Sequence, residues 1–118
     1  MEKIRQTIEQ FIKGGDTSNT ELLEQVLHSD YQNIQDGFFD KPGIFVISKK
    51  EYIQLVRDKV FGGRPRTIIY HTLEQKNNIV YARVSLENPV LRFSSLITCV
   101  RENEEWKVIT NIPSIEQK

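Results

Sequence analysis

Two titratable side chains in this 118-residue sequence could exchange protons with a bound molecule: Asp36 and His71. Asp36 follows a short extended run, and a carboxyl group in an apolar pocket acquires a raised pKa that suits it to moving protons between carbon atoms. The Asp-Gly pair also predicts a turn in which the carboxylate caps backbone amides. His71 shares the alternation of Thr67, Ile69 and Leu73, and imidazole titrates near neutral pH. A histidine on a sheet face is also often structural, so both interpretations stay open for each residue.

Three further polar side chains could hold a ligand without reacting with it. Arg92 stands between Leu91 and Phe93, and in a pocket its guanidinium would grip a carboxylate or phosphate with two parallel hydrogen bonds. On the outer face of a sheet it would simply reach water along its apolar stem. Tyr31 and Tyr70 offer phenol groups, although aromatic residues in strands also serve packing. These residues predict a small ligand, apolar or anionic.

Several kinds of chemistry find no matching pattern in the sequence. It holds no phosphate-binding loop, nucleophile motif or metal-ligand spacing, so we expect no cofactor and no metal. Cys99 is the only cysteine and is predicted to be a small buried hydrophobe. The sixteen basic and sixteen acidic residues cancel, which argues against nucleic acid as a partner.

Length and composition predict one domain over residues 1–118, with 38% hydrophobic and 27% charged residues. No stretch approaches the roughly 20 apolar residues that cross a bilayer. The first residues lack the apolar run of a signal peptide. We therefore expect a cytoplasmic protein without a membrane partner.

Helical periodicity predicts two helices in the first part of the chain, which would help to position the candidate site residues. Apolar residues at positions 4, 8, 11 and 12 predict a helix that Gly14 and Gly15 end. A second helix follows the capping residues 16–20 and buries positions 22, 23, 26 and 27. The two helices would form a hairpin with a short polar link.

The middle of the chain predicts a crossing segment and a third helix. Residues 31–35 form a short extended segment, and residues 38–47 a loop or short strand. Ser48 and Glu51 have the spacing of a capping box, which begins the helix. Val60 would lie on its inner face, and Gly62 with the following glycine would stop it.

The rest of the chain predicts an antiparallel meander, which makes the fold class α+β. Strands are expected over 67–75, 79–87, 90–101 and 106–112, separated by turn residues. Alternation places four apolar residues of the second strand on one buried face: Val80, Ala82, Val84 and Leu86. The strand 90–101 is apolar on both faces, with Phe93 and Ile97 on one and Leu96 on the other. Such a strand predicts a second covered face, and we expect a homodimer packed through the sheet.

Three groups of residues carry a resemblance to the nuclear transport factor 2-like superfamily, and within it to the group of lumazine-binding-like proteins. They are residues 28–31 (His-Ser-Asp-Tyr), residues 61–66 (Phe-Gly-Gly-Arg-Pro-Arg), and residues 93–96 with 106–109. The resemblance spans nearly the whole chain. It implies a cone-shaped α+β barrel, in which three helices pack on a strongly curved antiparallel sheet around an apolar cavity. Members of the group carry an acidic residue where this sequence has Asn111, which favours ligand contact over acid–base chemistry there.

Three functions follow as hypotheses. The first is a homodimeric small-molecule-binding domain with an apolar pocket between helices and sheet, to which Tyr31, Tyr70, Arg92 and Asn111 contribute. The second, which the resemblance also implies, is a cofactor-independent isomerase, dehydratase or cyclase with Asp36 and His71 as its acid and base. The third is a dimeric interaction module without a ligand. Whether any reaction is catalysed stays open.

Overall fold

Residues 2–118, which a computed structural model describes, form three helices and six strands in an α+β arrangement. The elements are α1 (Glu2–Asp16), α2 (Thr20–Val26), β1 (Leu27–Phe38), β2 (Lys41–Ser48), α3 (Lys49–Arg57), β3 (Thr67–Lys76), β4 (Ile79–Glu87), β5 (Leu91–Glu102) and β6 (Glu105–Gln117). Within this part of the chain, no helix is long and apolar enough to cross a membrane.

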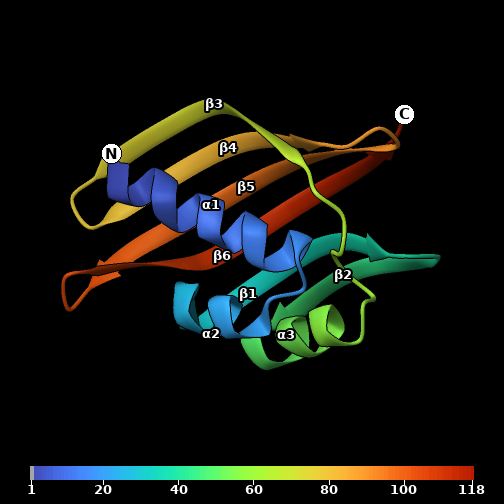
Figure 1. Ribbon diagram of the computed structural model, residues 1–118, viewed down its shortest axis with the longest axis horizontal. Helices are drawn as coiled ribbons and strands as arrows, with labels where there is room; N and C mark the ends of the chain where they lie inside the picture. The colour runs from blue at the N-terminus through green and yellow to red at the C-terminus, as the bar shows by residue number, and fades with distance from the viewer. Residues whose placement is uncertain (1) are drawn as a thin grey trace.

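The strands form one mixed sheet in the order β2-β1-β6-β5-β4-β3. Strands β3 to β6 form the predicted antiparallel meander, β1 and β2 form a further antiparallel hairpin, and β1 and β6 pair in parallel. The parallel pair arises because α3 and residues 58–66 carry the chain from one edge of the sheet to the other, so the first hairpin and the later meander meet at β1 and β6. Since β2 and β3 remain at opposite edges of the described chain, the sheet is curved but is not closed into a barrel (Figure 1).

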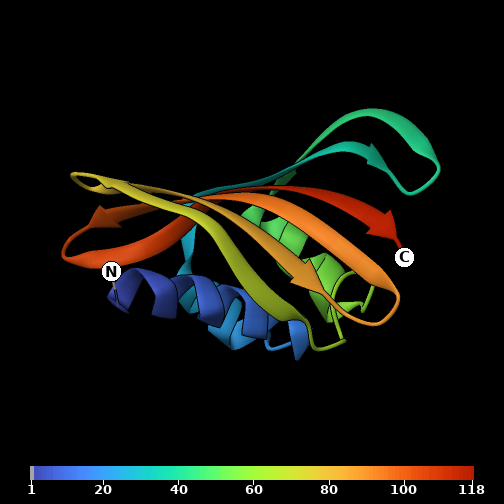
Figure 2. The same cartoon turned by 90° about the horizontal axis from the view of Figure 1, so that it is seen from above.

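The helices lie against one face of the sheet, which we call the concave face (Figure 2). The four apolar residues of β4 that were predicted to share a face are buried beneath them: Val80, Ala82, Val84 and Leu86. Helix α1 supplies the facing layer with Ile4, Ile8, Phe11 and Ile12, at the predicted helical spacing. The opposite, convex face is not covered by any element of residues 2–118 (Figure 2).

The observed helix boundaries confirm one prediction from the sequence and show that two others were wrong. Ser48 caps α3, and Glu51 completes the predicted capping box. Helix α1 does not end at Gly14 but continues to Asp16, and a Cβ on Gly14 would lie 2.7 Å from Leu23 Cδ2. That glycine therefore permits close packing of α1 on α2. Helix α3 ends at Arg57, earlier than predicted, which leaves Val60 exposed.

Two strands are longer than the sequence patterns indicated. Strand β1 covers twelve residues instead of five, and β6 continues through Pro113. The last β1–β6 partners are Asn33 and Asn111, so Pro113 lies just beyond the point where β6 loses its neighbour. Proline is tolerated at such a free edge because its missing N–H is not needed there. Figure 2 shows the outer part of the β1–β2 hairpin bending away from β6. We call this divergence the fork.

Candidate functional site

A cavity of about 1120 Å³ runs from the concave face past the end of the β1–β6 pairing to the convex face, and its lining includes residues of both faces. On the concave side it is lined by side chains of the helices, of the segment after α3 and of the sheet, among them Phe11, Asn33, Tyr52, Phe61, Ser95 and Asn111. Its lining continues past the end of the β1–β6 pairing to the convex side, where Leu96 and Ile112 contribute. The space is large enough for a ligand of ordinary cofactor size.

The floor of the cavity is a set of neutral polar side chains on adjacent strands. Asn33 and Gln35 come from β1, Asn111 from β6 and Ser95 from β5, and all four are buried. Asn33 and Asn111 are partners across the parallel pair, while Ser95 faces Pro113, two residues along β6. We call these four residues the polar floor. Amide and hydroxyl groups provide both donors and acceptors without charge.

Part of the polar floor is internally hydrogen-bonded and part is not. Gln35 Nε2 donates to Asn33 Oδ1 at 2.8 Å, and Asn33 Nδ2 donates to the Tyr31 hydroxyl at 3.3 Å. In contrast, Ser95 Oγ and Asn111 Oδ1 are buried without a hydrogen-bond partner among residues 2–118. Leaving a buried polar atom unpaired costs about 1–3 kcal/mol, so a ligand that pairs with either atom recovers that energy.

Aromatic rings form the wall above the floor. The ring centroids of Phe11 and Tyr52 lie 6.1 Å apart, and those of Tyr52 and Phe61 lie 5.9 Å apart. Burial raises the pKa of Tyr52 to about 12, and it also raises the pKa of Tyr31 well above its usual value. Both phenols therefore stay protonated at neutral pH and act as neutral hydrogen-bonding groups.

An ion pair frames the mouth of the cavity. Asp16, at the end of α1, accepts hydrogen bonds from Arg66 Nε at 2.7 Å and from the Arg66 backbone N–H at 3.1 Å. The Arg66 guanidinium also lies 4.7 Å from the centre of the Phe93 ring. Gly62 supports the same corner, because a Cβ there would collide with the carbonyl oxygen of Gly15. These contacts hold the segment before β3 against α1.

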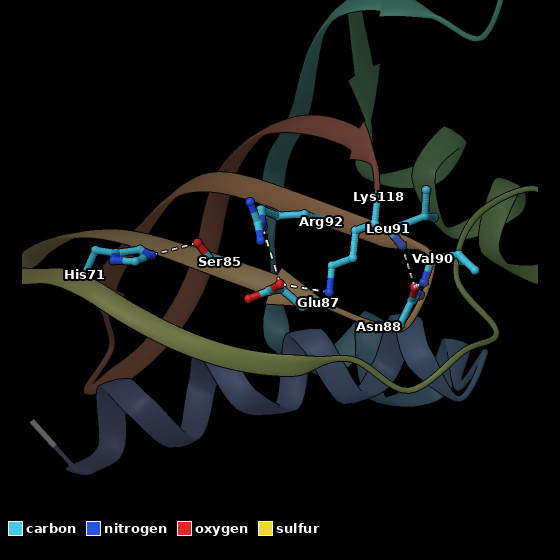
Figure 3. A network of polar contacts seen from close by, with 8 residues as sticks. All are labelled: His71, Ser85, Glu87, Asn88, Val90, Leu91, Arg92 and Lys118. Carbon is cyan, nitrogen blue, oxygen red and sulfur yellow. Dashed lines mark hydrogen bonds and ion pairs between the residues drawn. The ribbon is translucent and has the colours of Figure 1, made fainter.

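The structure places Asp36 on the β1–β2 hairpin beyond the fork and His71 on the edge strand β3, and neither residue belongs to the polar floor. Asp36 is exposed and pairs with Ile44 in the β1–β2 register, on the face opposite to Gln35. A bulge between Tyr70 and Thr72 interrupts β3, so Leu73 turns to the concave side while His71 remains convex and shares a hydrogen bond with Ser85 at 2.7 Å (Figure 3). Both residues border the cavity, and no contact joins them within the described chain.

The four predicted ligand contacts are dispersed. Asn111 lies in the polar floor, and Tyr31 lies behind it, in contact with Asn33. Tyr70 faces α1, where its hydroxyl donates to Glu9 at 3.3 Å, and it does not line the cavity. Arg92 is on the convex face in an ion pair with Glu87 at 3.3 Å, which Lys118 also joins (Figure 3).

Sequence reasoning did not identify Asn33, Gln35, Ser95 or Arg66 as residues of the cavity. A signal for the first two was present, since Tyr31, Asn33 and Gln35 alternate along one strand and must share a face. Neither Ser95 nor Arg66 carried a comparable signal. Ser95 interrupts an apolar face, and the partner of Arg66 lies 50 residues away.

The chain belongs to the family described as "Putative lumazine-binding", whose pattern it matches over residues 1–112. None of the curated proteins compared with the chain matches it.

Solved structures share the fold at low sequence identity. A nuclear transport factor 2-like protein of unknown function from Shewanella baltica OS155 has a TM-score of 0.83 at 13% identity and covers 99% of this chain and 94% of its own. One from Silicibacter pomeroyi DSS-3 has a TM-score of 0.81 at 11% identity, with 97% and 93% covered. A protein with a cystatin-like fold from Nostoc punctiforme PCC 73102 has a TM-score of 0.74 at 14% identity, with 97% and 89% covered. This similarity defines the fold as the nuclear transport factor 2-like cone.

Proposed function

We propose that this protein is a homodimeric domain that binds a small molecule in the cavity between its helices and its sheet. The observation that carries the proposal is the pair of buried, unpaired acceptors on the floor, Ser95 Oγ and Asn111 Oδ1. Folding alone has no use for such atoms, because each costs stability unless something pairs with it. The aromatic wall above them supplies the apolar contact that most ligand pockets provide.

Occupancy of the cavity is tested by native mass spectrometry of gently purified full-length protein, followed by solvent extraction and identification of any released compound. Lumazine, named in the family description, is one compound to add back. The substitution Ser95→Leu would place a bulky side chain over the floor and should abolish binding. Thr98→Val, which alters the convex face of the same strand, is the matched control. A folded protein that binds no small molecule would overturn this proposal.

We propose that two copies of the chain associate through the convex face, because a row of apolar side chains, which we call the apolar row, crosses that face. Leu96 pairs with Ile112, and Ile34 pairs with Val46, on four adjacent strands. Three of these side chains are exposed to solvent: Leu96 by 50%, Ile112 by 41% and Val46 by 54%. A two-fold axis through the row would bring it against its own copy, which is the geometry of most homodimers. Apolar surface of this kind commonly marks an interface.

Sedimentation equilibrium tests the dimer directly. The wild-type chain should sediment as a dimer at micromolar concentration, and Leu96→Glu should sediment as a folded monomer because it places a charge within the apolar row. Val90→Glu, at an exposed apolar residue outside the row, should leave the dimer intact. A monomeric wild-type protein would eliminate the dimer but not the ligand site.

The acid–base alternative has less support. Asp36 and His71 are exposed, whereas an acid–base pair of this kind works in an apolar, water-excluding site. The interaction-module alternative would be favoured by a cavity filled with side chains, and the cavity of about 1120 Å³ argues against it.

A further inference from the structure

We propose that the free edge of β2 binds an extended segment of a partner protein, in which apolar side chains at alternate positions are flanked by acidic residues. The segment would pair with β2 and fill a groove of about 740 Å³ that lies between β2 and α3. We call β2 together with this groove the edge site. It goes beyond the proposed function, because none of the residues that line the groove lines the larger cavity.

Strand β2 has no neighbour on its outer side within residues 2–118 (Figure 1). Every second residue of such a strand directs its N–H and C=O groups away from the sheet, where another chain can pair with them. The stretch from Ile44 to Ile47 is apolar, and Ile44 and Val46 are 68% and 54% exposed. It keeps a regular register with β1, without a bulge. An edge of this kind is open to the addition of a strand.

The opposite edge of the sheet, β3, is protected by devices that this stretch of β2 lacks. A bulge between Tyr70 and Thr72 interrupts the pairing of β3 with β4. The end of β3 carries Glu74 and Lys76, and charged side chains on an edge strand oppose pairing with another chain. Of the two edges, β2 is therefore the one that can accept a further strand.

The groove beside β2 offers apolar contacts to a strand added there. Phe38 and Phe45 line it with ring centroids 5.5 Å apart, and Leu55 lines it from α3. Because the side chains of a strand alternate between two faces, every second residue of an added strand would point toward α3 and into the groove. The edge site therefore selects apolar side chains at alternate positions.

The charges of the groove determine which residues should flank the apolar ones. Lys41 begins β2 and Lys50 follows its end, and neither lysine forms an ion pair within the described chain. The acidic residue of the lining, Glu51, already accepts a hydrogen bond from the Ser48 N–H. The eight residues of β2 extend over about 25 Å, so a bound strand of about seven residues would bring an acidic residue at each end near one lysine.

A second copy of this chain is a less favourable occupant of the edge site. Two β2 strands related by a two-fold axis run antiparallel, which would bring Lys41 of each copy toward Lys50 of the other. Like charges that face each other across a strand pair destabilise it, and Asp40 in the preceding turn offsets only one of the two cations. A partner segment with acidic ends avoids this repulsion and supplies the lysines with counter-charges.

Binding of synthetic peptides to the full-length chain tests the edge site. The probe is the labelled peptide Asp-Val-Thr-Val-Thr-Val-Asp, blocked at both ends, whose palindromic sequence suits a parallel or an antiparallel strand. Fluorescence anisotropy at low salt measures its affinity. We expect the same peptide with lysine at both ends to bind about tenfold more weakly, because two exposed attractions become repulsions. N-methylation of either the valines or the threonines blocks one edge of the peptide, so one of these two peptides should lose binding and the other should keep it.

Charge reversal assigns the binding to the edge site. The double variant Lys41→Glu/Lys50→Glu changes two exposed side chains and should invert the preference, so that the lysine-flanked peptide binds better. Lys13→Glu/Lys76→Glu, at two exposed lysines away from the groove, is the matched control and should keep the wild-type preference. In nitrogen–proton correlation spectra, the peptide should shift the backbone amides of β2 and α3 and leave those of β3 in place.

Four results would overturn the proposal. If no peptide binds to folded protein, or if the amide shifts concentrate on β3, there is no edge site on β2. If both N-methylated peptides bind as well as the parent peptide, groove contacts suffice and the strand pairing is wrong. If Leu96→Glu remains a dimer and the further change Ile44→Lys makes it a monomer, the edge binds a second copy instead. None of these results affects the cavity between helices and sheet, whose occupancy is tested separately.

Discussion

The two faces of the sheet are built from the same strands and differ in almost every physical property. The concave face is buried under α1 and α3 and carries apolar side chains around a neutral polar floor. The convex face is open to solvent and carries an apolar row beside charged groups such as Arg92 and Glu87. Alternation along each strand assigns neighbouring residues to these two environments, so Ser95 is buried and Leu96 is exposed.

The comparison shows that burial changes the hydrogen bonding and the solvation of the same residue type on the two faces. On the concave face, Ser95 is buried without a hydrogen-bond partner among residues 2–118, whereas Ser85 on the convex face pairs with His71 and is in reach of water. An ion pair at the cavity mouth is held between two nearly buried groups, whereas the convex ion pair is solvated. Each contrast can be tested by making the same substitution on both faces.

The largest effect is expected from truncating a core isoleucine. Ile97→Ala on the concave face, where the side chain is 1% exposed, should lower the free energy of unfolding by about 2–5 kcal/mol, because it removes buried methyl groups and leaves a void. Ile79→Ala on the convex side, at 41% exposure, should cost less than about 1 kcal/mol. Urea unfolding at one protein concentration measures both. Equal losses would contradict the assignment of the faces.

A smaller effect is expected from the ion pairs. The side chains of Asp16 and Arg66 are only 10% and 14% exposed, so Asp16→Asn should cost about 3 kcal/mol by leaving a nearly buried guanidinium without its counter-charge. On the convex face, Glu87→Gln should cost less than about 1 kcal/mol, since water already solvates that pair. Thermal unfolding at low and high salt distinguishes the two ion pairs, because added salt should weaken only the exposed pair.

The smallest effect at neutral pH concerns tyrosine ionisation. Burial raises the pKa of Tyr52 to about 12, while an unfolded tyrosine titrates near 10. The unfolded chain therefore loses this proton first, so the stability is complete below pH ~10 and falls by about 1.4 kcal/mol per pH unit as the pH rises toward 12. Tyr52→Phe should make the profile less steep across that window, while Tyr31, Tyr70 and Cys99, whose pKa values burial also raises, keep the rest of the slope.

The matched substitution is Tyr81→Phe, at an exposed tyrosine of the convex face. It should leave the dependence of stability on pH as it is in the parent protein. Denaturant unfolding at several pH values between 9 and 12 follows both variants. A parent and a Tyr52→Phe variant with parallel profiles would show that the hydroxyl of Tyr52 is accessible to water.

Much of the architecture could be predicted from the sequence because it depends on local patterns. The alternation of β4 placed Val80 and Val84 on the buried face, and the capping spacing of Ser48 and Glu51 located the start of α3. Where the local signal was ambiguous, the prediction was wrong. The glycines that seemed to end α1 instead permit its contact with Leu23, and that contact belongs to the tertiary structure.

The sequence alone determined the three helices, the strands of the meander, the alternation of β4 and β5, and the family to which the chain belongs. Only the tertiary structure decided that β1 and β6 pair in parallel, that the sheet forks beyond Asn33 and Asn111, and that Ser95 has no hydrogen-bond partner among residues 2–118. The physical reason is the range of the interactions. Periodicity and capping act within a few residues, whereas the polar floor is assembled from strands nearly 80 residues apart, whose meeting no local pattern encodes.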